Sequence, residues 1–154
     1  MSDLEKILVT SALTILGGVV VFVIGQLIAK LFIEPMQALK VVINDTRVAL
    51  AFHAAIINTP ISRTPETSDQ ASQALRKCSA ELFAKASSIP SYDNIARMSC
   101  GYLPRQTKLN DAVRELRGLS TYVFEEGNKA MEQLEIIRKI TERIERDLGL
   151  KPLP

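Results

Sequence analysis

The sequence predicts an all-α protein with one N-terminal transmembrane helix followed by a helical domain. The first observation is an uncharged apolar run over residues 7–29. The second is the composition, which is 47% hydrophobic but only 5% aromatic, with seven glycines and seven prolines. The third is that apolar residues after the run recur every three or four positions, the period of an amphipathic helix rather than a strand.

The apolar run is long enough to cross a bilayer. At ~1.5 Å per residue it makes a helix of roughly 35 Å, against a hydrocarbon core of ~30 Å. A cleaved secretory signal is not expected, because the start MSDLEK is not basic, the core is too long and no small-x-small site follows. We therefore expect a membrane unit over residues 1–34, with the span at about 7–33.

The charges that flank the run predict its orientation. Lys6 stands alone on the amino side, whereas Lys30, Lys40 and Arg47 follow on the carboxyl side. The positive-inside rule then places residues 35–154 in the cytoplasm, as part of a single-pass protein of the cell inner membrane.

One face of the membrane helix carries small and polar residues. These are Ser11, Thr14, Gly18, Gly25 and Gln26. Small residues let two helices approach closely in lipid, and hydroxyl and amide groups can bond across the contact, so this face predicts a homo-oligomer. The alternative is that the glycines only reflect their general frequency in membrane helices.

The helical domain is expected to be an antiparallel bundle of three main helices and a short connector. The predicted helices are Met36 to about Asn58, a second from an N-cap at Thr64 to about Ser87, a connector from Ser91 to about Ser99, and a long amphipathic helix from about Gln106 or Asn110 to Leu148. The expected inner faces are Met36, Leu39, Ile43, Leu50 and Ile57; Ala71, Leu75, Cys78, Leu82 and Ala86; and Leu109, Ala112, Leu116, Leu119 and Val123.

The end of the long helix predicts a second contact. Its apolar seam consists of Ala130, Leu134, Ile137, Thr141, Ile144 and Leu148. A continuous helix would carry this seam roughly 25 Å beyond the bundle, where another copy or a partner helix would cover it as a coiled coil. The alternative is a bend at Gly127 that folds the seam back onto its own bundle.

A basic cluster lies in and after the connection between the second and the long helix. Because neighbouring helices are antiparallel, this connection is expected to lie close to the membrane. The cluster consists of Arg97, Arg105, Lys108, Arg114 and Arg117. Basic side chains beside an anionic leaflet predict contact with lipid headgroups. A phosphate-bearing ligand and an ordinary solvated basic face are the two alternatives.

No catalytic, metal or cofactor pattern is found. The single histidine, His53, lies in an apolar stretch typical of a core, and Cys78 and Cys100 have no metal or redox spacing. The net charge of +2 gives no reason to expect nucleic-acid binding. We therefore expect a protein that is not an enzyme.

These expectations favour a membrane scaffold whose cytoplasmic domain recruits a partner, such as a helical protein. A first alternative is a membrane effector whose ligand binding or oligomerisation perturbs or permeabilises the bilayer. A second is a lysis protein of the spanin type, whose body would face the periplasm, against the charge bias.

Overall fold

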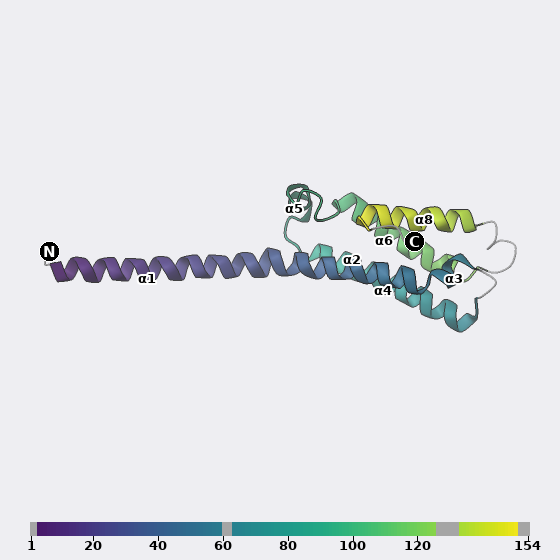
Figure 1. The fold of residues 1–154 in the computed structure, drawn as a ribbon, viewed down its shortest axis with the longest axis horizontal. Coiled ribbons are helices and arrows are strands. Elements are labelled where there is room, and N and C mark those ends of the chain that lie inside the picture. The colour runs from purple at the N-terminus through teal and green to yellow at the C-terminus, as the bar shows by residue number, and fades with distance from the viewer. Residues whose placement is uncertain (1–2, 60–62, 126–132, 151–154) are drawn as a thin grey trace.

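The computed structural model describes residues 3–59, 63–125 and 133–150. All elements in these ranges are helical (Figure 1). They are α1 (Asp3–Ile28), a π-helical turn η1 (Ala29–Ile33), α2 (Glu34–Phe52), α3 (Ala54–Asn58), α4 (Pro65–Ser87), α5 (Tyr92–Met98), α6 (Gln106–Tyr122) and α8 (Leu134–Leu148).

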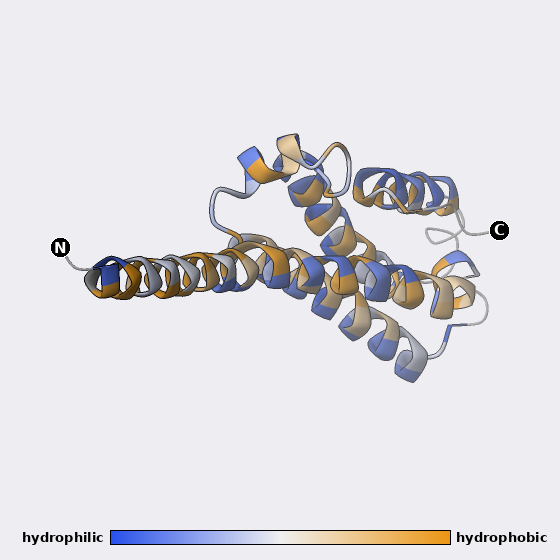
Figure 2. Cartoon of the chain, turned by 60° about the vertical axis from the view of Figure 1, so that its left-hand side comes forward, coloured by the Kyte–Doolittle hydropathy of each residue, from blue (hydrophilic) through white to orange (hydrophobic). Residues whose placement is uncertain are grey.

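α1 projects away from the other helices, and the side chains that the structure describes in it are exposed (Figure 1). It forms the first part of one 47-residue helix, Lys6–Phe52, which is long and apolar enough to cross a membrane. Figure 2 shows hydrophobic colouring along α1, whereas the other helices have hydrophobic and hydrophilic sides. The all-helical class and the long apolar N-terminal helix are therefore as predicted.

The turn η1 joins α1 to α2 without ending the helix. Pro35 has no N–H to donate to the carbonyl of Leu31, and its ring would collide with that carbonyl in a regular α-helix. The backbone N–H of Glu34 instead donates to the carbonyl of Ala29, five residues earlier. A π-turn of this kind accommodates the proline while the helix continues.

α2, α4, α6 and α8 surround one apolar core. α4 packs against both α2 and α6, and α8 packs against α6 (Figure 1). The expected inner residues of the three predicted helices are buried, from Leu39 and Ile57 to Leu82, Leu116 and Val123, except Met36, which is partly buried. Helical periodicity was therefore enough to identify these core faces.

The predicted start of α4 is confirmed. Thr64 is the N-cap, and its hydroxyl accepts a hydrogen bond from the N–H of Thr67 at 3.3 Å. The Thr67 hydroxyl in turn accepts from the N–H of Thr64 at 2.9 Å, which completes a capping box before Pro65. Ser91 also takes the N-cap position of α5, but with φ of +51° and no side-chain capping bond.

The prediction of one continuous helix from Gln106 to Leu148 is wrong. α6 ends at Tyr122 in a turn in which the N–H of Phe124 donates to the carbonyl of Thr121. α8 then returns alongside α6 (Figure 1), as the folding-back alternative expects. Gly127, where that bend was placed, lies outside the described residues.

The reason for the return is the apolar seam itself. Ile137, Ile144 and Leu148 are at most 2% exposed and belong to the same core as α6. Burying such side chains within one chain is worth about 1.5–3 kcal/mol each and needs no second copy. Leu134 and Thr141 are half-buried, and Ala130 lies outside the described residues, so this seam is not a free coiled-coil surface.

Arg63 ties two helix ends together. Its guanidinium donates to the carbonyls of Ile56 at 2.8 Å and Ile57 at 3.0 Å, at the end of α3. It also donates to the carbonyls of Tyr122 at 3.1 Å and Glu125 at 2.7 Å, just after α6. Burial lowers the pKa of Arg63 and the Glu125 carboxylate opposes that shift. A cation at two helix C-termini also stabilises both helix dipoles.

Candidate functional site

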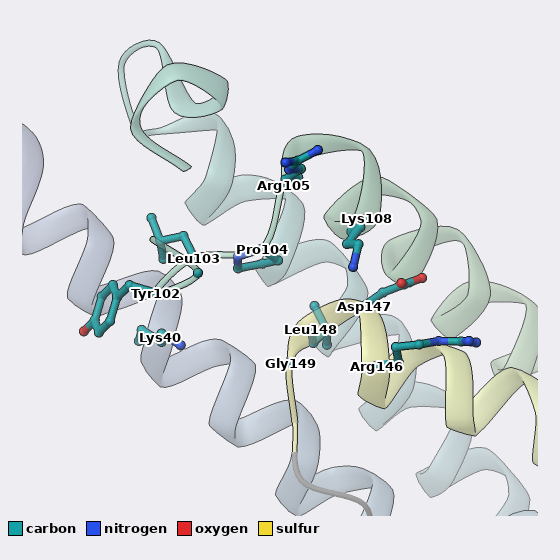
Figure 3. Close-up of a pocket in the computed structure, with 11 residues that line it drawn as sticks. Lys40, Tyr102, Leu103, Pro104, Arg105, Lys108, Arg146, Asp147, Leu148 and Gly149 are labelled. Carbon is teal, nitrogen blue, oxygen red and sulfur yellow. The ribbon is translucent and has the colours of Figure 1, made fainter. Parts of the chain in front are cut away.

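A cavity of about 420 Å³ opens at the corner where the loop before α6 meets the ends of other helices. Figure 3 shows that its walls come from α2, from residues 101–105, from the first turn of α6 and from the last turn of α8. Its polar side chains are Lys40, Tyr102, Arg105, Lys108, Arg146 and Asp147. We call this site the basic cavity.

Positive charge dominates the basic cavity. Lys40, Arg105, Lys108 and Arg146 face one carboxylate, that of Asp147. In the part of the chain that the structure describes, no salt bridge involves any of these four cations. Among the described residues, the cavity therefore gathers cations that form no ion pair with a carboxylate.

The loop before α6 is fixed from two sides. The hydroxyl of Tyr92, which is buried in α5, donates to the carbonyl of Pro104 at 2.7 Å. Leu103 is 2% exposed and anchors the loop in the core. The Nζ atom of Lys40 lies 4.8 Å from the ring centroid of Tyr102, a cation–π contact that joins α2 to the loop.

The N-terminus of α6 adds backbone donors to the same corner. Arg105 is its N-cap, and no side chain accepts a capping hydrogen bond there. The first turn of α6 contains no acidic residue. The first N–H groups of a helix have no partners within the helix and carry partial positive charge, so this end reinforces the field of the basic side chains.

The structure brings together only two of the five basic residues predicted for lipid or phosphate contact. Arg105 and Lys108 both line the basic cavity. Arg97 is paired with Asp93 one helical turn away, and Arg114 lies 3.9 Å from Asp111 on an exposed face.

Arg117 belongs to a different place, between α4 and α6. Its Nε atom donates to the hydroxyl of Ser79 at 3.1 Å, while Arg76 donates to the hydroxyl of Ser120 at 3.3 Å. Arg76, Arg117 and Ser120 line a separate cavity of about 380 Å³. The five predicted residues therefore do not form one surface.

Lys40 and Arg146 are the residues that sequence reasoning missed. From the sequence, Lys40 served only as one of the charges that follow the apolar run, and Arg146 had no predicted role. Local spacing contains no signal for Arg146, because it reaches the cavity only when α8 folds back along α6.

The predicted contact face of α1 is exposed along its length. This holds for Ser11, Thr14, Gly18, Gly25 and Gln26. The hydroxyl of Thr14 donates to the carbonyl of Thr10 at 2.9 Å, so its proton is already used within the helix. A Cβ atom at Gly18 or Gly25 would meet nothing within 4 Å, which leaves space for another helix to approach.

His53 lies at the break between α2 and α3. It is 8% exposed, and its ring meets that of Phe52 edge-on with centroids 5.0 Å apart. Burial lowers the pKa of His53, which favours the neutral imidazole. Among the described residues no three His, Cys, Asp or Glu side chains form a group that could hold a metal ion.

No protein-family model, curated protein or solved structure matches the chain.

Proposed function

We propose that the protein is a single-pass, self-associating membrane protein whose helical domain serves as a scaffold or recruiting module at the cytoplasmic face of the inner membrane. The observation that carries this proposal is the exposed apolar helix α1. Leaving large apolar side chains in water costs about 1.5–3 kcal/mol each relative to burying them, so such a helix needs lipid or protein around it. The excess of Lys and Arg after the span supports the cytoplasmic orientation.

Self-association is supported by two features of the same long helix. The first is the open face at Gly18 and Gly25. The second is an apolar stripe on α2, interrupted by the exposed Asn44 and Asp45, where Val41, Val48 and Phe52 are 56%, 64% and 80% exposed. Their spacing places them on one side of the helix. Copies that meet through α1 would bring these stripes close together, where each could cover the other.

Membrane insertion and topology come first in the test. After expression of the full chain, we expect it to stay in the membrane fraction during alkaline extraction. A reporter active only in the cytoplasm, fused after Pro154, is expected to be active. Release by alkali would contradict the membrane proposal, and a silent reporter would favour the periplasmic lysis alternative.

Self-association is tested with matched glycine variants. Gly18→Leu and Gly25→Leu are expected to convert the oligomer to monomer in native mass spectrometry of the protein in mild detergent. Gly17→Leu is the control, because it adds the same bulk and apolarity one residue away, and a Cβ there also meets nothing within 4 Å. An oligomer that survives the first two substitutions would contradict the proposed face.

The effector alternative predicts a further result that a scaffold does not. Vesicles containing the wild-type protein would leak a trapped dye, and Gly18→Leu would stop the leakage. We expect intact vesicles with both proteins. Leakage that depends on Gly18 would replace the scaffold proposal by the effector.

A further inference from the structure

We propose that the basic cavity binds a phosphate group, and that the headgroup of an anionic lipid supplies it. The lipid source rests on the proposed function, because it requires α1 to lie in the bilayer. The phosphate chemistry rests only on the cavity. An inner-leaflet lipid and a soluble phosphate compound share this chemistry, and the experiment below separates them.

The side chains of the basic cavity suit phosphate better than other ligands. Arg105 and Arg146 present planar guanidinium groups that can donate two parallel hydrogen bonds to one phosphate, while Lys40 and Lys108 provide point charges. Figure 3 shows Lys108 pointing toward the last turn of α8, whereas the exposed guanidinium groups of Arg105 and Arg146 point outward, away from each other. An anion beside Lys108 would be held from α6 and α8 together once these two side chains turn toward it.

The backbone favours the same ligand. The N-terminus of α6, which has no side-chain cap, opens at Arg105 and Lys108. Free N–H groups at a helix start bind phosphate oxygens, and here they act together with four cations rather than alone. Asp147 offsets one of the four charges, so the site keeps an excess of positive charge. The cavity is also of the size usual for small ligands.

The position of the cavity favours a lipid. The helix is continuous from Lys6 to Phe52, so Lys40 follows the last apolar residues of the span by about two turns, or ~10 Å. The headgroup layer extends ~5–8 Å beyond the hydrocarbon on each side. The basic cavity would therefore lie at the outer edge of that layer, from which long basic side chains can extend toward a headgroup. α5 lies at the same end of the domain (Figure 1), and Met98 in it is 82% exposed.

The first arm measures lipid binding by the full-length protein in a neutral detergent. Native mass spectrometry is used to titrate dioleoylphosphatidylglycerol and, separately, dioleoylphosphatidylcholine. The wild type is expected to retain the anionic lipid in preference to the neutral one. The double variant Arg105→Gln/Lys108→Gln is expected to bind it about thirtyfold more weakly, from the usual contribution of two basic residues beside an anionic headgroup.

A charge-matched control separates a site from general attraction. Lys77→Gln/Lys85→Gln removes the same charge from exposed positions on α4 that line no part of the basic cavity. Its lipid affinity is expected to stay within about twofold of the wild type. Equal weakening by both double variants would overturn the proposal, and so would a wild type that prefers neither lipid and gains no stability from phosphate.

The second arm identifies the source of the phosphate. Inorganic phosphate is added to the wild type without lipid, and the thermal midpoint is measured. If the lipid is the source, phosphate raises the midpoint less than dioleoylphosphatidylglycerol does at the same concentration. A rise in the wild type that Arg105→Gln/Lys108→Gln abolishes, with unchanged lipid binding, confirms the phosphate site and assigns it to a soluble ligand. Neither substitution touches α1, so alkaline extraction and the oligomeric state test the proposed function independently.

Discussion

Replacing Arg63 by methionine should strongly destabilise the helical domain, although Arg63 lies in a connection between helices. Its guanidinium donates four hydrogen bonds, at 2.7–3.1 Å, to carbonyls at the ends of α3 and α6. Methionine keeps the length and the apolar part of the side chain but can donate none of these bonds.

The expected loss follows from these contacts. A hydrogen bond from a charged donor contributes about 1.5–3 kcal/mol, but Arg63 is only half-buried and water can reach some of the carbonyls. A total of about 3 kcal/mol is therefore reasonable, roughly a 150-fold change in the unfolding equilibrium. For ~120 residues with an unfolding entropy near 2.1 cal/mol/K per residue, the thermal midpoint would fall by about 12 °C.

A thiol-reactive fluorescent maleimide can follow this unfolding in detergent. Cys78 is buried and reacts when the domain opens, while the exposed Cys100 is changed to Ser in every protein compared. Arg138→Met is the matched control, because Arg138 is exposed and has a single ion pair at 3.7 Å with Glu142. If Arg63→Met lowers the midpoint no more than Arg138→Met, the helix-end role of Arg63 is wrong.

Two further substitutions test the pH dependence of stability. Burial is the main cause that raises the pKa of Glu115, so the ionised carboxylate lowers the stability of the folded domain as pH rises above about 4.5. Glu115→Gln should therefore make the thermal midpoint depend less on pH in this range. An unchanged slope of midpoint against pH would contradict this. Burial raises the pKa of Tyr92 to about 12, so the unfolded chain ionises first and the wild type loses stability between about pH 10 and 12. Tyr92→Phe should cost about 1 kcal/mol at neutral pH, from the lost bond to Pro104, but remove that alkaline loss; a parallel alkaline decline in both proteins would argue against it.

Features that depend on a few neighbouring residues could be predicted from the sequence. The N-cap at Thr64, the end of α4 at Ser87 and the buried stripes of α2, α4 and α6 all follow from local spacing and cap chemistry. The π-turn before Pro35 was not predicted, because local spacing does not show how a helix accommodates a proline.

The sequence did not predict which surface an apolar helix face packs against. The seam of Ile137, Ile144 and Leu148 has the same period whether it packs on its own chain or on another copy. In the structure this seam packs in the same core as α6. The same packing also brings the last turn of α8 to the candidate site. Arg146 lies beside Arg105 and Lys108 only because α8 folds back along α6. The prediction of one continuous helix therefore also excluded the basic cavity.

The π-turn gives the two exposed faces of the long helix a common direction. Val48 follows Gly25 by 48 − 25 = 23 residues. In an uninterrupted α-helix, at ~100° per residue, they would lie about 140° apart. The bond from Glu34 to Ala29 encloses one residue more than an α-helical turn, which reduces the angle to roughly 40°. The apolar stripe of α2 therefore lies close to the same side of the helix as the glycine face of α1.

Pro35→Ala tests whether this alignment matters. Alanine can donate its N–H to the carbonyl of Leu31, so the helix is expected to become regular and turn the stripe by about 100° away from the glycine face. With Val48→Cys introduced after both native cysteines are changed to Ser, oxidative cross-linking between copies in membranes should be efficient when Pro35 is present and several-fold weaker when Pro35→Ala is added. Gln73→Cys, on the exposed side of α4, is the control and should cross-link poorly in both backgrounds. Equal cross-linking of Val48→Cys with and without the proline would show that the π-turn does not set the geometry of self-association.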